Sequence, residues 1–270
     1  MENPLCQLVL ENLKQVGNPF GYPREWRSYN RFRPAYRRPR TLLFSGCYGT
    51  LINPRATRAA EELLAWLGYS YTTLLEKEYC CGAPALACGE EETVRRLANH
   101  LLECCKEEGV KRVVTACARC YRVLAHIYPQ ILPNWRLEVS YLPDLLLRAV
   151  KTRHFELLWR PPSTVLVANL PEPPPVPTER LLRMLGLRRR IATIAVDQHL
   201  CSLRYREPST AFQHAKRVLD AAASYEAVSI VISCEACKAV VQEVGTVYMP
   251  VPVFNAVEFV RDLVLGVPEG

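Results

Sequence analysis

Five of the chain's twelve cysteines fall into one ordered pattern between residues 41 and 121. A first cysteine is followed by an adjacent pair that precedes a glycine, and then by two cysteines two residues apart. The pattern is Cys-x32-Cys-Cys-Gly-x34-Cys-x2-Cys. We refer to its cysteines as the N-terminal thiol set: Cys47, Cys80, Cys81, Cys117 and Cys120. Thiols in such a pattern could form disulfides, bind metal or pack as small apolar side chains.

The surrounding sequence favours metal binding among these three alternatives. The chain does not open with a charged stretch followed by an apolar one, which indicates an intracellular protein whose thiols stay reduced. In that setting, ordered cysteine spacings indicate metal or catalytic sites. A tight turn promoted by Gly82 and Pro84 would direct two adjacent sulfur atoms toward a site larger than one ion. A polynuclear cluster therefore fits the adjacent pair better than a single zinc ion.

Alternating strands and helices are expected to position these thiols. The predicted strands cover residues 41–45, 69–75 and 111–115, and the predicted helices cover residues 1–16, 55–67, 91–107 and 142–153. Such alternation predicts an α/β fold with a mostly parallel sheet. Cys47, the Cys80–Cys81 pair and Cys117 each follow a predicted strand, so they should meet beyond the carboxyl ends of the strands.

An internal repeat divides the chain. Residues 113–124 resemble residues 230–241 at an offset of 117 (234 − 117), which predicts two pseudo-repeated halves, each with a mostly parallel sheet flanked by helices. The expected organisation is an N-terminal helix with an arginine-rich linker (1–40), a first cysteine-rich domain (41–162) and a second, degenerate one (163–270).

The second copy of the pattern has lost cysteines. Prolines such as Pro171 follow its first predicted strand, and it keeps one cysteine where the first copy has an adjacent pair. We refer to its remaining candidates as the C-terminal ligand set: His199, Cys201, Cys234 and Cys237. Three thiolates and an imidazole can hold a tetrahedral zinc ion. An empty, packed remnant and a cluster remain alternatives.

Four cysteines lie outside both sets. Cys104 and Cys105 fall within a predicted helix and are expected to be small buried apolar residues. Cys6 is expected to be a buried or interface residue. Cys88 follows the turn, and a place beside the ligands is the less favoured alternative for it. None of the four is assigned to a metal.

Charge is concentrated in one segment. Seven arginines lie between residues 24 and 40 against the single acid Glu25, a local balance of +6 (7 − 1) in a chain of net charge +7. Since the remainder is nearly neutral, the chain does not have the charge distribution of a nucleic-acid-binding protein. We expect this segment to be a solvated or partner-docking arm, and we interpret it as an interface. No stretch offers the roughly 20 uninterrupted apolar residues of a membrane span.

Three motifs, at residues 44–47, 78–84 and 114–121, carry a family resemblance. They resemble the cysteine-rich CCG domain of the B-type subunit of heterodisulfide reductase and its relatives in lactate and glycolate utilisation, glycerol-3-phosphate dehydrogenase and some succinate dehydrogenases. The resemblance covers most of the chain. It implies that the N-terminal thiol set holds a noncubane [4Fe-4S] cluster, although in some members such a motif holds zinc.

The resemblance also implies a function. The expected role is that of an iron–sulfur subunit of a heterodisulfide-reductase-like complex, an oxidoreductase that reduces a disulfide or relays electrons. The alternatives are a non-catalytic electron-transfer or assembly subunit of a flavoprotein dehydrogenase of the lactate, glycolate or succinate type, and a zinc-binding scaffold. Residues 17–26 resemble the linker that follows a ferredoxin-like module in single-chain relatives. The expected partners are therefore a ferredoxin-like iron–sulfur subunit and a flavoprotein subunit, in the cytoplasm, with any membrane association occurring through them.

Overall fold

The protein is described here from a computed structural model, which covers residues 3–29, 34, 36, 39–152, 156–171 and 174–267. The chain divides into two compact units, Met1–Tyr141 and Leu142–Gly270. Each unit is built around its own parallel sheet and is described by itself.

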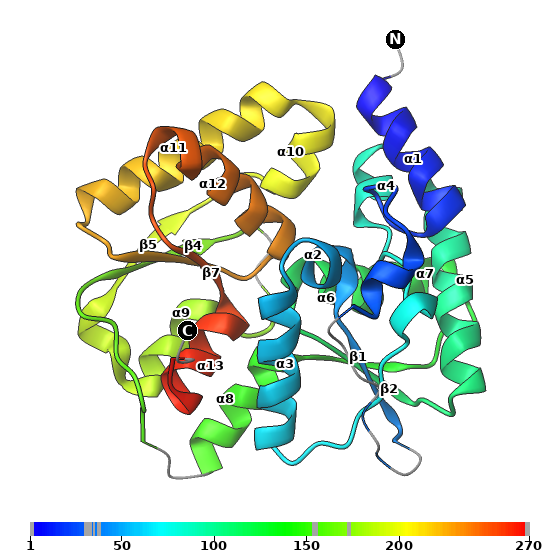
Figure 1. The fold of residues 1–270 in the computed structure, drawn as a ribbon, viewed down its shortest axis with the longest axis horizontal. Coiled ribbons are helices and arrows are strands. Elements are labelled where there is room, and N and C mark those ends of the chain that lie inside the picture. The colour runs from blue at the N-terminus through cyan, green and yellow to red at the C-terminus, as the bar shows by residue number, and fades with distance from the viewer. Residues whose placement is uncertain are drawn as a thin grey trace. The chain divides into compact units, whose positions relative to one another are not determined.

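The first unit contains a three-stranded parallel sheet of order β1-β2-β3 (Figure 1). Its strands are β1 (Thr41–Phe44), β2 (Arg112–Thr115) and β3 (Glu138–Tyr141). The centres of β1 and β2 are apolar, and side chains such as Leu42, Leu43 and Val113 are completely buried. A parallel sheet needs such continuous apolar strands because helices cover both of its faces.

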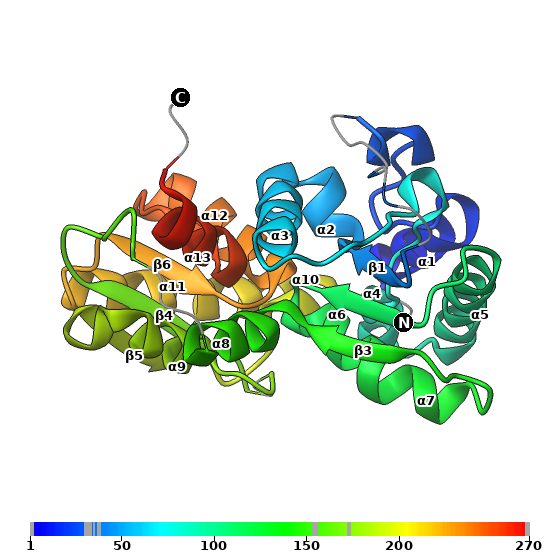
Figure 2. The same cartoon turned by 90° about the horizontal axis from the view of Figure 1, so that it is seen from below.

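Helices make up most of the rest of the first unit, and the expected helices over 55–67 and 91–107 are confirmed. The α-helices are α1 (Pro4–Val16), α2 (Gly46–Leu51), α3 (Pro54–Trp66), α4 (Ala83–Ala87), α5 (Glu91–Glu107), α6 (Ala118–Arg122) and α7 (Tyr128–Ile131). Short helical turns are η1 (Arg24–Arg27), η2 (Leu75–Lys77) and η3 (Val123–Ile127). Figure 2 shows α3 and α7 on opposite sides of the strands.

The predicted strand over 69–75 is wrong for most of its length. Only Thr72 pairs with β1, in an isolated bridge with Leu42. The chain then turns at Leu75, whose φ of 51° lies in the left-handed region, and continues into η2. Leu74, with φ −90° and ψ −14°, and the left-handed Leu75 both lie outside the β region, so a strand cannot extend through residues 74 and 75.

The second unit has a four-stranded parallel sheet of order β5-β4-β6-β7. Its strands are β4 (Val165–Asn169), β5 (Ile191–Ala195), β6 (Ser229–Ile232) and β7 (Val253–Asn255). β6 begins 117 residues after β2 (229 − 112), the same offset as the sequence repeat. In the second unit, β5 pairs with β4, the strand that corresponds to β1. In the first unit, the corresponding place beside β1 is occupied only by the bridge from Thr72. The prediction of two repeated α/β halves with parallel sheets is confirmed.

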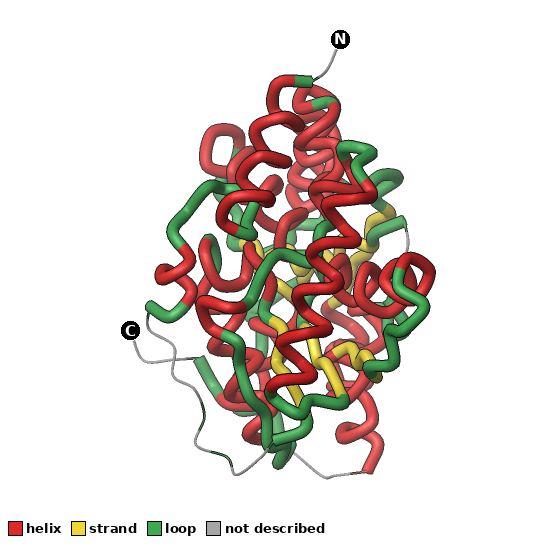
Figure 3. The backbone as a smooth tube through the Cα atoms, turned by 90° about the vertical axis from the view of Figure 1, so that its right-hand side faces the viewer, coloured by secondary structure: helices red, strands yellow, loops and turns green. Residues whose placement is uncertain are grey.

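Helices cover both faces of the second sheet as well. They are α8 (Leu142–Thr152), α9 (Thr178–Leu182), α10 (Leu200–Arg206), α11 (Pro208–Ser224), α12 (Glu235–Tyr248) and α13 (Ala256–Leu265), with the turns η4 (Arg183–Leu187) and η5 (Arg188–Arg190). α10, α11 and α12 pack together on one face, and α8 packs with α9 and α13 on the other (Figure 1). Figure 3 shows the strands of the protein as short segments among longer helices. Among the described residues, no helix combines the length and the apolar character that crossing a membrane requires.

Candidate metal centre

The structure brings the N-terminal thiol set together inside the first unit. Cys47 lies in the first turn of α2, Cys80 and Cys81 lie between η2 and α4, and Cys117 and Cys120 lie at the start of α6. All five side chains are buried and none is in a disulfide. The sulfur atoms of Cys47 and Cys80 are 3.4 Å apart, although 33 positions separate them in the chain.

Thiol-to-thiol contacts link the members of this set. Hydrogen bonding with Cys47, and then with Cys81, raises the pKa of the Cys80 thiol well above its ordinary value. Hydrogen bonds from Cys120, and then from Cys80, hold the pKa of Cys81 well below its ordinary value despite burial. Hydrogen bonding with Cys117 raises the pKa of Cys120. The contacts therefore favour the thiolate form more at Cys81 than at Cys80 or Cys120, and the set presents soft sulfur donors of the kind that iron–sulfur clusters use.

Two glycines permit the turns that carry these thiols. Gly46 has a φ of 76°, and a Cβ on it would lie 3.0 Å from the sulfur of Cys120. Gly82 has a φ of 88°, and a Cβ on it would lie 3.2 Å from a methyl carbon of Val94 on α5. A side chain at either position would combine strained backbone with a close contact. The tight turn predicted after the Cys80–Cys81 pair is confirmed.

A buried carboxylate supports the turn before Cys47. Glu78 accepts hydrogen bonds from the backbone N–H groups of Ser45 (3.2 Å) and Gly46 (2.9 Å). It also forms an ion pair with Arg27, at 3.3 Å between Nη1 and Oε1. Arg27 in turn donates to the hydroxyl of Thr50 at 2.9 Å. No local sequence signal marks this pairing, because the two charged residues are 51 positions apart.

Arg27 does not fit the expected solvated or partner-docking arm. Its side chain is 1% exposed, and the arginine therefore belongs to the interior of the first unit. Arg24 donates to the backbone oxygen of Gln15 and lies over the ring of Tyr79. Four further arginines of this segment lie outside the described residues: Arg31, Arg33, Arg37 and Arg38.

A second buried side chain supports the adjacent cysteine pair. The hydroxyl of Tyr128 donates to the backbone oxygen of Cys81 at 3.0 Å. Burial raises the pKa of this hydroxyl well above its ordinary value, so it remains a proton donor. Tyr128 is 47 residues from Cys81, and sequence reasoning did not single it out.

The cysteines outside both sets divide into two kinds. Cys6 on α1 and Cys88 at the end of α4 form a disulfide with a Cα–Cα distance of 5.5 Å. This pairing was not predicted. Cys6, expected at a buried or interface position, and Cys88, expected outside the ligand set, are both half-buried. Cys104 and Cys105 are buried on α5, as predicted. Burial, with a smaller effect of Cys104, raises the pKa of Cys105 to about 12, so that its thiol stays protonated at neutral pH.

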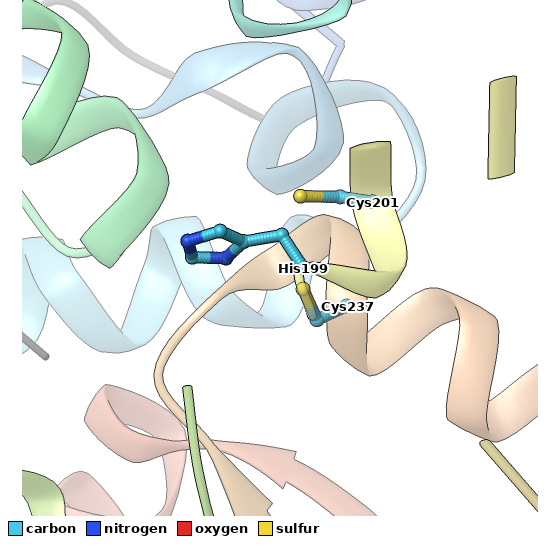
Figure 4. A group of neighbouring side chains, drawn as sticks. All are labelled: His199, Cys201 and Cys237. Atoms are coloured by element: carbon cyan, nitrogen blue, oxygen red, sulfur yellow. The ribbon is translucent and has the colours of Figure 1, made fainter. Parts of the chain in front are cut away.

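The C-terminal ligand set is partly assembled in the second unit. The ligand atoms of His199, Cys201 and Cys237 all lie within 4.8 Å of one another. Figure 4 shows these side chains together, with Cys201 on α10 and Cys237 on α12. The sulfur of Cys234 instead accepts the N–H of Cys237 at 3.4 Å, at the start of α12. The described geometry thus supplies a compact group of three ligands, with a fourth thiol beside it.

An open pocket of about 710 Å³ lies elsewhere on the first unit, beside α5. Its lining includes Tyr79 and His100, whose rings stack at a centroid distance of 3.7 Å. Tyr79 precedes Cys80 in the chain, but no member of the N-terminal thiol set lines this pocket. The pocket is therefore separate from the thiol site.

Comparisons with known proteins identify a cysteine-rich domain over the segment that contains these thiols. A family model described as a cysteine-rich domain, CCG, matches residues 41–125. One subunit of the dihydromethanophenazine:CoB–CoM heterodisulfide reductase of Methanosarcina mazei is 30% identical over 114 residues, which are 41% of this chain and 28% of that protein. EtfAB:quinone oxidoreductase of Syntrophomonas wolfei is 33% identical over 112 residues, which are 40% of this chain and 15% of that protein. The chain thus matches less than a third of the length of either relative.

A solved structure shows the fold over nearly the whole chain. The crystal structure of a hypothetical protein from Helicobacter pylori covers 97% of this chain and 54% of its own, with a TM-score of 0.65 and 12% identity. At that identity the likeness concerns the fold alone. The segment matched by the family model contains the whole N-terminal thiol set, and it ends close after α6. Residues 41–125 of the chain therefore match the CCG cysteine-rich domain, and the similarity to known proteins concerns this part of the chain.

Proposed function

We propose that the chain is an iron–sulfur subunit of an oxidoreductase complex, in which the N-terminal thiol set holds a noncubane [4Fe-4S] cluster. The observation that carries the proposal is the convergence of five buried thiols, none of them in a disulfide, from three separate segments. The similarity of the chain to a subunit of a heterodisulfide reductase supports disulfide reduction as the reaction. Cys47, Cys80, Cys81, Cys117 and Cys120 would be the ligands.

The donor set fits such a cluster on chemical grounds. Five sulfur atoms contributed from α2, α6 and the turn before α4 offer more soft ligands than one tetrahedral ion accepts. When bound, the cluster would supply one-electron chemistry and an iron atom with affinity for thiolate sulfur. The protein residues would hold it in a buried environment, and burial is one of the factors that set its reduction potential.

A second candidate is an electron-transfer or assembly role beside a flavoprotein. The similarity to EtfAB:quinone oxidoreductase favours it. In this role the chain would relay electrons without binding a disulfide. In both roles it would work with partner subunits, one carrying ferredoxin-like clusters and one carrying flavin. Turnover of a disulfide by the reconstituted complex would separate the two roles.

The C-terminal ligand set is proposed to bind zinc rather than a cluster. His199, Cys201 and Cys237 already form a compact group, and Cys234 would supply the fourth ligand after a small movement. Three thiolates and one imidazole match a structural zinc site. Burial, and then hydrogen bonding with Cys201, raises the pKa of Cys237 in the metal-free protein. Zinc binding would release protons from such thiols.

The test is iron and sulfide analysis of anaerobically purified protein. The wild-type chain should contain about four iron atoms and the Cys81→Ala variant should lose most of them, because a thiolate ligand is removed. Cys104→Ala is the matched control, since it removes a buried thiol outside the set, and it should keep its iron. Full iron in the Cys81→Ala variant, or equal loss in both variants, would contradict the ligand assignment.

A further inference from the structure

The ion pair of Arg27 and Glu78 lies beside the N-terminal thiol set without contributing a ligand to it. The two side chains are 1% and 0% exposed. Among the described residues, nitrogen Nη2 of Arg27 is buried and has no hydrogen-bond partner. A buried ion pair with an unsatisfied donor adds little net stability, because desolvation offsets the attraction between the charges. Stability alone therefore does not explain the pair.

Glu78 connects two segments of the thiol set. Its carboxylate accepts the N–H groups of Ser45 and Gly46, the two residues before Cys47. Along its own segment of chain, Cys80 follows two residues later. The carboxylate of Glu78 thus holds the backbone before Cys47 close to the segment that contains Cys80. The sulfur atoms of these two cysteines are 3.4 Å apart.

Arg27 completes the support from a segment that precedes the matched domain. Its Nη1 donates to the hydroxyl of Thr50 at 2.9 Å, and that hydroxyl donates to the backbone oxygen of Gly46 at 2.7 Å. Both polar groups of the Gly46 backbone are therefore held by this network. η1, which carries Arg27, packs on η2 and α2.

We infer that Arg27 and Glu78 are positioning residues that fix the backbone around Cys47 so that its sulfur lies against that of Cys80. The inference deepens the proposed function, on which its metal-binding consequence rests. It also means that residues before the matched segment, which begins at residue 41, are part of the site. A chain shortened to the matched domain would lose this support.

The test measures how fast individual thiols react in the full-length, metal-free chain under anaerobic conditions. Iodoacetamide labelling is followed by peptide mass spectrometry at Cys47, Cys105 and Cys237. In an Arg27→Met/Glu78→Leu double variant, labelling of Cys47 should accelerate about tenfold or more, because the local opening that exposes it becomes easier. Labelling of Cys105 and Cys237 should stay within about twofold of wild type.

Two further variants sharpen the test. Arg27→Lys keeps a cation at the position and should recover part of the Cys47 protection. Lys238→Met/Glu258→Leu removes a comparable buried ion pair of the second unit, whose charged atoms are 2.6 Å apart, and should leave Cys47 unchanged. An unchanged Cys47 rate in the Arg27/Glu78 variant would overturn the inference. So would an equal acceleration at all three thiols, which indicates general destabilisation.

Iron reconstitution provides the second readout. The Arg27→Met/Glu78→Leu chain should bind less iron than wild type, since the apolar pair cannot accept the N–H groups of Ser45 and Gly46. The Lys238→Met/Glu258→Leu chain, which keeps this acceptor, should bind as much iron as wild type. Wild-type protein that binds no iron would contradict the proposed function, whereas the labelling rates would still decide the positioning role.

Discussion

Gly46 lies so close to the sulfur of Cys120 that a side chain at residue 46 would crowd that sulfur. A Cβ on Gly46 would lie 3.0 Å from that sulfur, and the residue has a φ of 76°. The two residues come from segments 74 positions apart (120 − 46). This approach brings the turn of Cys47 and the start of α6 to the same site.

The Gly46→Ala variant should therefore be destabilised by about 1–3 kcal/mol through backbone strain and should also lose iron-binding capacity. Gly68→Ala is the matched control, because Gly68 has a φ of 81° and a Cβ added to it would meet nothing within 4 Å. It should show the strain without the loss of iron. Urea denaturation and iron analysis of both variants make the comparison, and equal iron in the two would argue against a role for the close approach.

Tyr128 is expected to stabilise the Cys80–Cys81 turn through its hydroxyl. In Tyr128→Phe the buried backbone oxygen of Cys81 loses its donor, which should cost about 1–2 kcal/mol of unfolding free energy. Tyr225→Phe alters an exposed ring, 51% accessible, and should change stability little. Chemical denaturation of both variants measures their unfolding free energies. An equal effect of the two substitutions would show that the hydrogen bond from Tyr128 does not stabilise the turn.

Glu90 gives a pH-dependent prediction. Its carboxylate caps α5 by accepting the N–H of Thr93 at 2.7 Å. Burial acts to raise the pKa of Glu90, but the hydrogen bonds from Thr93 outweigh it and the pKa is lowered. Because the pKa of Glu90 is lower in the folded state, its carboxylate stabilises the fold at pH values above the ordinary glutamate pKa of about 4.3. This contribution is lost as the pH falls through the pKa that Glu90 has in the folded state.

Glu90→Gln should accordingly lower stability at pH 7 by about 1 kcal/mol, as loss of a helix cap does, and should approach wild type in acid. Glu103→Gln on the exposed face of the same helix is the control and should follow wild type throughout. Thermal unfolding from pH 3 to pH 7 measures both. A Glu90→Gln deficit that persists unchanged at pH 3 would show that the charge is not involved.

The disulfide between Cys6 and Cys88 closes a loop across 82 positions. Restriction of the unfolded chain by a loop of this length predicts about 4 kcal/mol of stabilisation at most. The Cys6→Ser/Cys88→Ser variant should be less stable than oxidised wild type, and it should not respond to added reductant. If reductant lowers the unfolding free energy of this variant as much as that of wild type, the effect does not come from this disulfide.

Local patterns were sufficient to predict much of the fold and the thiol site. The apolar periodicity of residues 91–107 predicted α5, and the repeat at an offset of 117 predicted the second sheet. The turn signals around Gly82 and the strand before Cys117 were enough to expect convergence of the thiols, because parallel strands end at one edge of a sheet.

Features that depend on distant residues could not be predicted in this way. Nothing local marks Arg27 for burial, since its partner Glu78 comes from another segment. The Cys6–Cys88 pairing depends on how α1 packs against α4. The strand over 69–75 was predicted from composition, but strand formation depends on a continuous partner, and only Thr72 finds one in β1.

The central claim is that five thiols share one cluster, and the most direct measurement is electron paramagnetic resonance of the anaerobically reconstituted full chain. Wild type should give one cluster signal accompanied by about four irons per chain. Single alanine variants at Cys47, Cys80, Cys81, Cys117 and Cys120 should each alter or abolish that signal, while Cys104→Ala and Cys105→Ala should preserve it. A colourless wild-type chain that binds only zinc, or a signal that survives unchanged in any of the five variants, would contradict the account.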